Sequence, residues 1–363
     1  LALEVGRENV LFVHLTLLPY LHASGEIKTK PTQHGVWKLR EIGILPDILI
    51  CRTEKSLTEE LKAKISLFCN VPREAVIEEK DVDVTIYEVP LVLQEQKLDD
   101  LVVRKLGLSA GTANIDRWRA IVEILKNPKH VAEIAVVGKY LEHGDAYKSV
   151  FEAMTHGGIA NQAKVKLRKV NAEDVEEKGA EGFLRGAQGL LVPGGFGIRG
   201  TEGKVDAIEW ARTNRVPFLG LCLGMQCASI EFARNVLGLK GANSSEFDEA
   251  TPHPVIDLME GQRSVHRKGG TMRLGAYPCR IKPGTRAHAA YGKEMVTERH
   301  RHRFEFNNKY RDEYARRGFV FSGINPDADL VEMIELADHP WFLATQFHPE
   351  FQSKPTDAHP LFR

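Results

Sequence analysis

A cysteine between two glycines is the most reactive arrangement in this sequence. Residues 216–226 begin as an apolar run and end in Gly220-Leu-Cys222-Leu-Gly224, after which an amphipathic pattern starts. This pattern predicts a strand, a tight turn and a helix, with the glycines at positions where the backbone leaves no room for a Cβ atom. Because a helix N-terminus lowers the pKa of a thiol, we expect Cys222 to be a thiolate near neutral pH.

The same turn is known with serine as the nucleophile elbow, in which the amide after the nucleophile contributes to an oxyanion hole. Here that amide belongs to Leu223. The alternative interpretation is a structural cysteine buried in an α/β core. A base and further oxyanion donors elsewhere in the chain would favour the interpretation of Cys222 as a nucleophile.

Two other segments supply such groups. Residues 191–197 have the sequence Leu-Val-Pro-Gly-Gly-Phe-Gly, and their glycines allow backbone amides to point at an anion. The alternative interpretation is a glycine-rich turn that only reverses the chain. Residues 343–350 contain His348 and Glu350, which project to the same side of an extended segment. The carboxylate can then fix the imidazole tautomer while the other ring nitrogen faces a thiolate, as covalent acyl transfer requires.

These three segments, Gly-Leu-Cys-Leu-Gly-Met-Gln, Pro-Gly-Gly-Phe-Gly and Gln-Phe-His-Pro-Glu, resemble the signatures of class I glutamine amidotransferases. The resemblance implies that Cys222 attacks the side-chain amide of L-glutamine, that His348 is the general base and acid, and that Glu350 orients it. It also implies five supporting residues: the oxyanion donors Gly195 and Leu223, the amino-acid contacts Gln226 and Glu246, and the carboxylate ligand Arg303. The product is ammonia, which is used elsewhere in the enzyme.

Other segments resemble the CTP synthase family, and this similarity spans nearly the whole chain. It is carried by residues 25–34, 68–72, 80–83, 138–140, 145–149, 270–275 and 298–305. It implies that ammonia aminates C4 of UTP after ATP phosphorylates the pyrimidine oxygen. The implied contacts with UTP or CTP are Lys28, Lys30, Gln33 and Lys64, and the implied contacts with adenine are Asp81, Val82 and Asp83.

The lysines of the first segment also have a simpler interpretation. Lys28 and Lys30 are expected in a loop whose path Pro31 fixes, and two ammonium groups beside Gln33 suit a triphosphate and a pyrimidine edge. A solvated lysine pair is the alternative, and composition alone favours it.

The elements that must position these residues follow an α/β pattern. Short β-rich runs alternate with helical patterns, which is typical of parallel sheets with helical crossovers. We expect part of a parallel-sheet synthase (amidoligase) domain at 1–107, a linker at 108–130, and a doubly wound class I glutamine amidotransferase domain at 131–363. Strands are expected at 10–15, 47–51, 75–78, 133–137, 164–170, 189–192 and 217–221, and helices at 33–42, 58–68, 99–106, 115–126, 146–156, 203–213 and 225–237. Ligands of such sheets lie beyond the carboxyl ends of the strands, where Cys222 is placed.

Composition excludes several classes of protein. The 49 basic residues balance the 49 acidic ones, so no overall field favours nucleic acid. The five cysteines form no Cys-X-X-Cys pair, which excludes a zinc site of that type and a disulfide framework, and favours a cytoplasmic setting. The apolar stretch at 10–23 is too short and too polar to span a membrane. The run Arg299-His-Arg-His-Arg303 predicts neither a metal site nor a nucleic-acid patch, and its remaining basic residues are expected on solvated strand faces.

The resemblance also implies partners. They are UTP, ATP with Mg²⁺, GTP as an activator, CTP as a feedback inhibitor, and other copies of the chain in a homotetramer, with no prosthetic group. No Gly-X-X-X-X-Gly-Lys-Ser/Thr segment occurs, so we expect the ATP phosphate loop and the magnesium ligands outside this chain, which we interpret as part of a longer protein. Two alternatives are a non-catalytic nucleotide-sensing or assembly module, and another class I glutamine amidotransferase or a thiol peptidase of similar fold.

Overall fold

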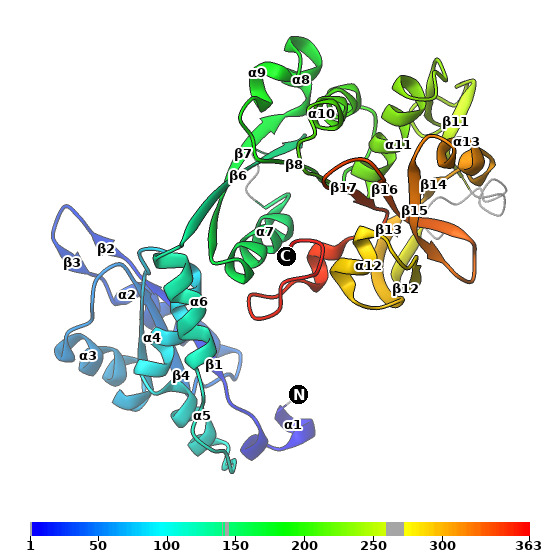
Figure 1. Cartoon of the computed structure of the whole chain (residues 1–363). Helices are drawn as coiled ribbons and strands as arrows, with labels where there is room; N and C mark the ends of the chain where they lie inside the picture. The colour runs from blue at the N-terminus through cyan, green and yellow to red at the C-terminus, as the bar shows by residue number, and fades with distance from the viewer. Residues whose placement is uncertain (1, 140, 142–144, 259–271) are drawn as a thin grey trace. The chain divides into compact units, whose positions relative to one another are not determined.

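The chain folds as two units, Leu1–Asn127 and Pro128–Arg363 (Figure 1). The computed structural model describes residues 2–139, 141, 145–258 and 272–363. Three residues of the segments quoted above, Tyr140, Gly270 and Thr271, lie outside this part of the chain. Within the described part, no helix is long and apolar enough to cross a membrane.

The first unit contains a parallel three-stranded sheet in the order β1-β4-β5. Its strands are β1 (Val13–Leu18), β4 (Ile48–Thr53) and β5 (Val76–Lys80), and a small hairpin pairs β2 (Tyr20–Leu21) with β3 (Glu26–Ile27). The helices are α1 (Ala2–Val5), α2 (Lys30–Glu41), α3 (Glu59–Cys69), α4 (Val89–Glu95), α5 (Leu98–Lys105) and α6 (Asp116–Lys126), with 3-10 turns at Arg7–Asn9, Arg73–Ala75 and Ile86–Glu88.

Helix α3 shows how local sequence sets these bounds. The Thr58 side chain accepts a hydrogen bond from Leu61 N, and Glu59 and Glu60 place negative charge at the positive end of the helix. The helix ends at Asn70, which adopts the left-handed conformation that asparagine tolerates. Capping thus explains both ends.

The second unit is built on a nine-stranded mixed sheet in the order β13-β12-β15-β16-β17-β9-β8-β6-β7. The five strands from β17 to β7 are parallel, and the pairs from β17 through β13 are antiparallel. The parallel strands are β6 (His130–Gly138), β7 (Ala163–Asn171), β8 (Gly189–Val192), β9 (Phe218–Leu221) and β17 (Phe342–Thr345). The others are β12 (Arg273–Ile281), β13 (Met295–His302), β15 (Phe319–Asn325) and β16 (Leu330–Leu336), and a separate small sheet contains β10 (Ala242–Ser244), β11 (His253–Leu258) and β14 (Phe304–Phe306).

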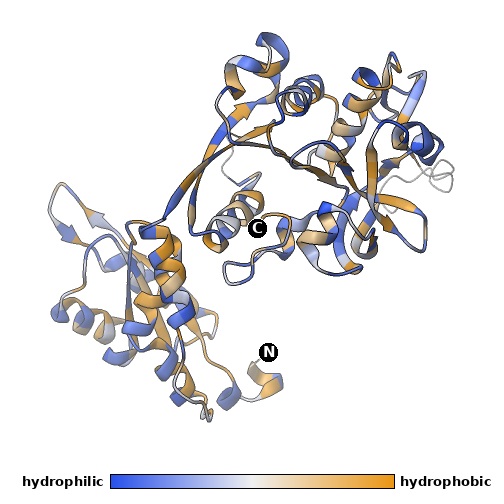
Figure 2. Cartoon of the chain, viewed as in Figure 1, coloured by the Kyte–Doolittle hydropathy of each residue, from blue (hydrophilic) through white to orange (hydrophobic). Residues whose placement is uncertain are grey.

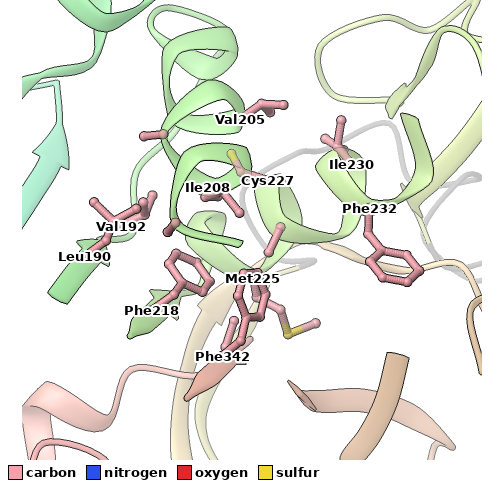
Figure 3. Close-up of a cluster of buried hydrophobic side chains, with 14 of the residues drawn as sticks. Leu190, Val192, Val205, Ile208, Phe218, Met225, Cys227, Ile230, Phe232 and Phe342 are labelled. Carbon is pink, nitrogen blue, oxygen red and sulfur yellow. The ribbon is translucent and has the colours of Figure 1, made fainter. Parts of the chain in front are cut away.

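The helices of this unit include α10 and α11, whose buried faces form the core with the parallel strands. Their bounds are α7 (Lys148–Ala160), α8 (Ala172–Lys178), α9 (Glu181–Leu184), α10 (Thr201–Thr213), α11 (Leu223–Asn235), α12 (Arg286–Tyr291) and α13 (Arg311–Ala315), with 3-10 turns at Asn308–Tyr310 and Pro349–Gln352. Figure 3 shows Phe218 and Phe342 of adjacent strands close to Met225 of α11, with Ile208 of α10 nearby. Figure 2 shows hydrophobic residues in the strands and on parts of the helices, consistent with a sheet covered by amphipathic helices.

The α/β fold is confirmed, and the strands and helices expected up to residue 237 lie within a few residues of the observed ones, whereas β10 to β16, α4, α12 and α13 were not predicted. The strand expected at 189–192 has those bounds, and the helix expected at 203–213 begins two residues earlier. The loop expected around Lys30 is wrong, because Lys30 is the first residue of α2. Pro31 favours this early start, since its fixed φ suits the first turn of a helix and its missing N–H costs no helical hydrogen bond there.

Candidate active site

Cys222 lies at the turn between β9 and α11, with backbone angles φ 51° and ψ −101°. A non-glycine residue in this region is strained, and such strain concentrates at functional sites. The turn is held because Cys222 N donates to Thr345 O at 2.7 Å and Cys222 O accepts from Met225 N at 3.0 Å. The residue is 3% exposed and lies at the positive end of α11.

The two glycines are required for the reason expected from the sequence. A Cβ atom at Gly224 would lie 2.2 Å from Val192 O, and one at Gly220 would lie 2.9 Å from the Cβ atom of Ala344. The helix therefore packs its first turn directly against β8, and the strand packs against β17. This close packing brings the thiol to the edge of the sheet.

We predict that Gly224→Ala lowers the free energy of unfolding by about 1–3 kcal/mol, since the new methyl group must displace backbone. Chemical denaturation of the variant and the parent protein measures this loss. Gly182→Ala is the matched control, because Gly182 is also helical and has no atom within 4 Å of the added Cβ. Equal stability of the two variants would contradict the close packing.

His348 follows β17, the strand next to β9, and its Nδ1 atom lies 2.8 Å from Glu350 Oε1. The pair forms as expected, but the expected extended segment is wrong: Pro349–Gln352 is a 3-10 turn. Pro349 explains the difference, because proline is favoured at the first position of a helical turn. The turn still directs the carboxylate of Glu350 at the ring.

The thiol and the imidazole flank Gly194. A Cβ atom there would lie 2.9 Å from Cε1 of His348 and 3.5 Å from the Cβ atom of Cys222. Burial alone would lower the pKa of His348, but its interactions with Cys222 and Glu350 outweigh burial and raise that pKa to about 10. The ring is therefore an imidazolium at neutral pH, the form that can give a proton to a leaving group.

The other cysteines lie in apolar surroundings that suppress their reactivity. Burial raises the pKa of Cys51 to about 12 and that of Cys227 to about 11, and it also raises the pKa of Cys69 and Cys279. All five cysteines are free. Of the five, Cys222 is the one that lines a pocket together with the His348–Glu350 pair.

A cavity of about 140 Å³ opens beside Cys222. Comparable cavities hold a molecule of benzene's size. Four of the five supporting residues inferred from the sequence line it, and the full lining is Gly195, Phe196, Cys222, Gln226, Glu246, Met272, His302, Arg303 and Phe304. Leu223 is outside this lining, but its N–H belongs to the first turn of α11, where amides have no helical acceptor. The carboxyl ends of three adjacent parallel strands thus supply the site: β8 leads into the glycine-rich loop, β9 into the thiol and β17 into the imidazole.

Gln346 is a neighbour of the thiol to which sequence reasoning gave no role. Its Nε2 atom lies 3.7 Å from Cys222 Sγ, and its Oε1 atom accepts from Gln226 Nε2 at 3.2 Å. Gln226 also donates to Phe304 O at 3.1 Å. The available signal was its place in the Gln-Phe-His-Pro-Glu segment, two residues before His348.

The basic run at residues 299–303 is divided between the two faces of β13. Arg299 and Arg301 are exposed, but His300 and His302 are buried, so the expectation of solvated strand faces is wrong for the histidines. The strand alternates its side chains between solvent and a buried ionic cluster that includes Arg273. Burial lowers the pKa of His302 to about 3, so its ring is neutral. The described residues contain no group of three or more His, Cys, Asp or Glu side chains that could hold a metal ion.

In the first unit, Lys28 and Lys64, two of the three basic residues inferred as nucleotide contacts, lie near Glu26. Lys28 Nζ lies 2.5 Å from Glu26 Oε2, and this hydrogen bond, together with the charges of Lys28 and Lys64, lowers the pKa of Glu26. Lys30 is exposed at the start of α2, and Gln33 is buried and donates to Thr29 Oγ1.

The adenine contacts inferred from the sequence follow directly after β5. Asp81 is paired with Arg52 at 2.7 Å, Val82 is partly buried and Asp83 is exposed. The nucleotide roles of the residues in this unit stay predictions.

Comparison with known families gives two matches. The family described as "Glutamine amidotransferase class-I" matches residues 143–363, and the family described as "CTP synthase N-terminus" matches residues 1–108. Among curated proteins, the chain is 59% identical over 362 residues to a CTP synthase from Caldanaerobacter subterraneus, covering 100% of this chain and 67% of that protein. It is 57% identical over 360 residues to a CTP synthase from Carboxydothermus hydrogenoformans, covering 99% of this chain and 67% of that protein.

One solved structure resembles this chain in both sequence and fold. It is described as "Trypanosoma brucei CTPS - glutaminase domain with bound acivicin" and is 38% identical, with a TM-score of 0.60. The match covers 64% of this chain and 90% of that one.

Proposed function

The chain belongs to the CTP synthase family, and on this premise we propose that it hydrolyses L-glutamine at Cys222 and supplies ammonia for the amination of ATP-activated UTP to CTP. The observation that carries the proposal is the position of Cys222, between a histidine–carboxylate pair and a small cavity that has Glu246 and Arg303 in its wall. Covalent acyl transfer needs both a nucleophile with a proton donor and a place for the carbonyl oxygen.

In the proposed reaction, the thiolate of Cys222 attacks Cδ of glutamine, and the carbonyl oxygen gains the negative charge. The amides of Gly195 and Leu223 stabilise this oxyanion, and donors of this kind are commonly worth ~2.7–4 kcal/mol each. The imidazolium of His348 gives its proton to the amide nitrogen, the C–N bond breaks, and ammonia leaves. The neutral imidazole then takes a proton from water, which attacks the thioester and releases glutamate.

The small cavity supports the choice of an amino-acid substrate. The guanidinium of Arg303 suits a bidentate contact with the α-carboxylate, and the carboxylate of Glu246 suits the α-ammonium group. Gln226 lies in the same wall and completes the proposed contacts with the amino-acid end. Opposite charges across one cavity match a zwitterion better than a peptide chain.

The nucleotide half of the reaction is proposed on the family alone. We assign the synthase part to residues 1–107, the linker to 108–130 and the amidotransferase to 131–363. UTP or CTP would contact Lys28, Lys30, Gln33 and Lys64, and adenine would contact residues 81–83. The magnesium ligands are proposed to lie outside this chain, so no step is assigned to a magnesium ion. Activation by GTP, inhibition by CTP, a homotetramer and a cytoplasmic location remain predictions.

Two assays separate this proposal from its alternatives. We expect the purified protein to convert glutamine to glutamate and ammonia, and we expect UTP to raise its melting temperature. A nucleotide-sensing module would be stabilised by UTP without releasing ammonia. Another amidotransferase or a thiol peptidase would show no stabilisation by UTP, and a protein that neither hydrolyses glutamine nor binds UTP would contradict the proposal as a whole.

A further inference from the structure

A buried lysine holds the glycine-rich loop that carries the proposed oxyanion donor. Lys139 directly follows β6, the strand beside β8, and is 6% exposed. Its Nζ atom donates to Phe196 O at 2.7 Å and to Gly197 O at 2.5 Å. A fourth adjacent strand end therefore contributes to the site, in addition to those of β8, β9 and β17.

The peptide group between Phe196 and Gly197 is held from both sides. Its carbonyl oxygen accepts from Lys139, and its N–H donates to Glu246 Oε1 at 3.2 Å. Because the C=O and N–H of a trans peptide point in opposite directions, a cation on one side and a carboxylate on the other fix the plane of the peptide. The amide of Gly195 lies two peptide groups earlier in the same loop.

An ammonium group suits this task. It has three donors and no acceptor, so it binds acceptors such as carbonyl oxygens, and it opposes rotation of either carbonyl away from it. Burying such a charge is costly unless it is well hydrogen-bonded. Burial lowers the pKa of Lys139, which shows the cost, while two carbonyl contacts offset part of it.

A second buried lysine provides a comparison. Lys204 of α10 is 0% exposed, and its Nζ atom would lie 3.5 Å from a Cβ atom on Gly195. Its Nζ atom has no hydrogen-bond partner among the described residues. The same loop thus has one lysine that binds its carbonyl oxygens and one that only approaches it.

We propose that Lys139 is a positioning residue for glutamine hydrolysis: its ammonium group fixes the carbonyls of Phe196 and Gly197, so that the Gly195 amide is directed at the oxyanion. This inference rests on the proposed function and adds a residue to it. It also connects substrate binding to the loop, because Glu246, the proposed ligand of the substrate's ammonium group, holds the other side of the same peptide. Lys139 touches no reacting atom and acts through the loop.

The test compares Lys139→Met with Lys204→Met in the full chain. Both replace a buried ammonium by a side chain of similar length, but only the first removes hydrogen bonds from the loop. We expect Lys139→Met to lower kcat for glutamine by roughly 10- to 100-fold, below the 10²–10³ lost with a whole oxyanion donor. The KM for glutamine should change by less than about threefold. Lys204→Met removes a buried charge but no hydrogen bond to the loop, so it should lower kcat less than Lys139→Met does.

A second readout reports the oxyanion position directly. L-Glutamate γ-semialdehyde adds the thiol of Cys222 across its C=O bond, which forms a C–S bond and leaves an oxygen where the oxyanion would lie. We expect Lys139→Met to weaken inhibition by this aldehyde by the same factor as kcat, with inhibition by glutamate unchanged. Lys139→Gln keeps one donor of similar length, should give an intermediate kcat, and carries the test if the methionine variant does not fold.

The outcomes distinguish the two levels of the proposal. Parent protein that does not hydrolyse glutamine contradicts the proposed function itself. An active parent with unchanged kcat and aldehyde affinity in the Lys139 variants overturns the positioning role alone. An effect confined to KM, or an equal loss in Lys204→Met, also overturns it.

Discussion

Replacement of Cys222 by alanine is expected to abolish glutamine hydrolysis, with a residual rate lower by on the order of 10⁴-fold or more. The reason is that no other described cysteine lies beside the histidine–carboxylate pair and the glycine-rich loop. Removing the nucleophile prevents the thioester, while Arg303 and Glu246 remain in the cavity wall. Ammonia release measured with a coupled glutamate assay gives the loss, and binding of glutamate should persist.

Cys227→Ala is the matched control for this variant. Cys227 lies on the same helix and is fully buried among apolar side chains (Figure 3), and it lines neither of the two cavities that Cys222 lines. We expect this variant to keep its activity. Equal losses in the two variants would indicate damage to α11 rather than removal of a nucleophile.

Glu350→Gln is expected to reduce kcat by roughly 10²- to 10⁴-fold, as does the loss of an orienting carboxylate in other triads. The carboxylate binds Nδ1 of His348 at 2.8 Å and, with Cys222, raises the pKa of the ring to about 10. An amide at this position can hold the ring but cannot stabilise its positive charge.

The sign of the accompanying pH effect follows from that contact. Because the pKa of His348 is raised, its ring stays an imidazolium until the pH rises through about 10. The contacts of the ring with Cys222 and Glu350 also stabilise the folded state. This stabilisation is complete below the ordinary histidine pKa of about 6.5 and is lost as the pH rises through about 10. Without the Glu350 charge, the alkaline limb of the pH–rate profile should therefore move to lower pH. Glu249→Gln, at an exposed position, should leave both kcat and the limb unchanged. A limb that stays in place in Glu350→Gln would contradict the role of Glu350.

The parts of the fold that the sequence predicted well are those set by nearby residues. The elbow at Cys222 follows from two glycines and an apolar run, and the close approaches at Gly220 and Gly224 confirm the reason given for them. Because parallel strands bring their carboxyl ends to one edge of a sheet, the sequence alone predicted that the motifs at Cys222, at residues 194–197 and at His348 lie together.

Other features depend on contacts between distant residues. The antiparallel half of the large sheet arises from pairings such as β12 with β13 and β15, which no local pattern specifies. The same reason applies to Lys139, whose partners lie 57 and 58 residues away in the chain. His300 and His302 could have been placed by strand alternation, but only tertiary packing shows which face of β13 is buried.

The most direct test of the central claim is to locate the covalent bond to a glutamine-like electrophile. The protein is treated with a chloroketone analogue of glutamine, digested, and analysed by mass spectrometry with and without an excess of free glutamine. We predict one label per chain on Cys222, suppressed by glutamine and absent from Cys222→Ala. Labelling of another residue, labelling that glutamine does not suppress, or full labelling of Cys222→Ala would contradict the assignment of Cys222 as the glutamine-specific nucleophile.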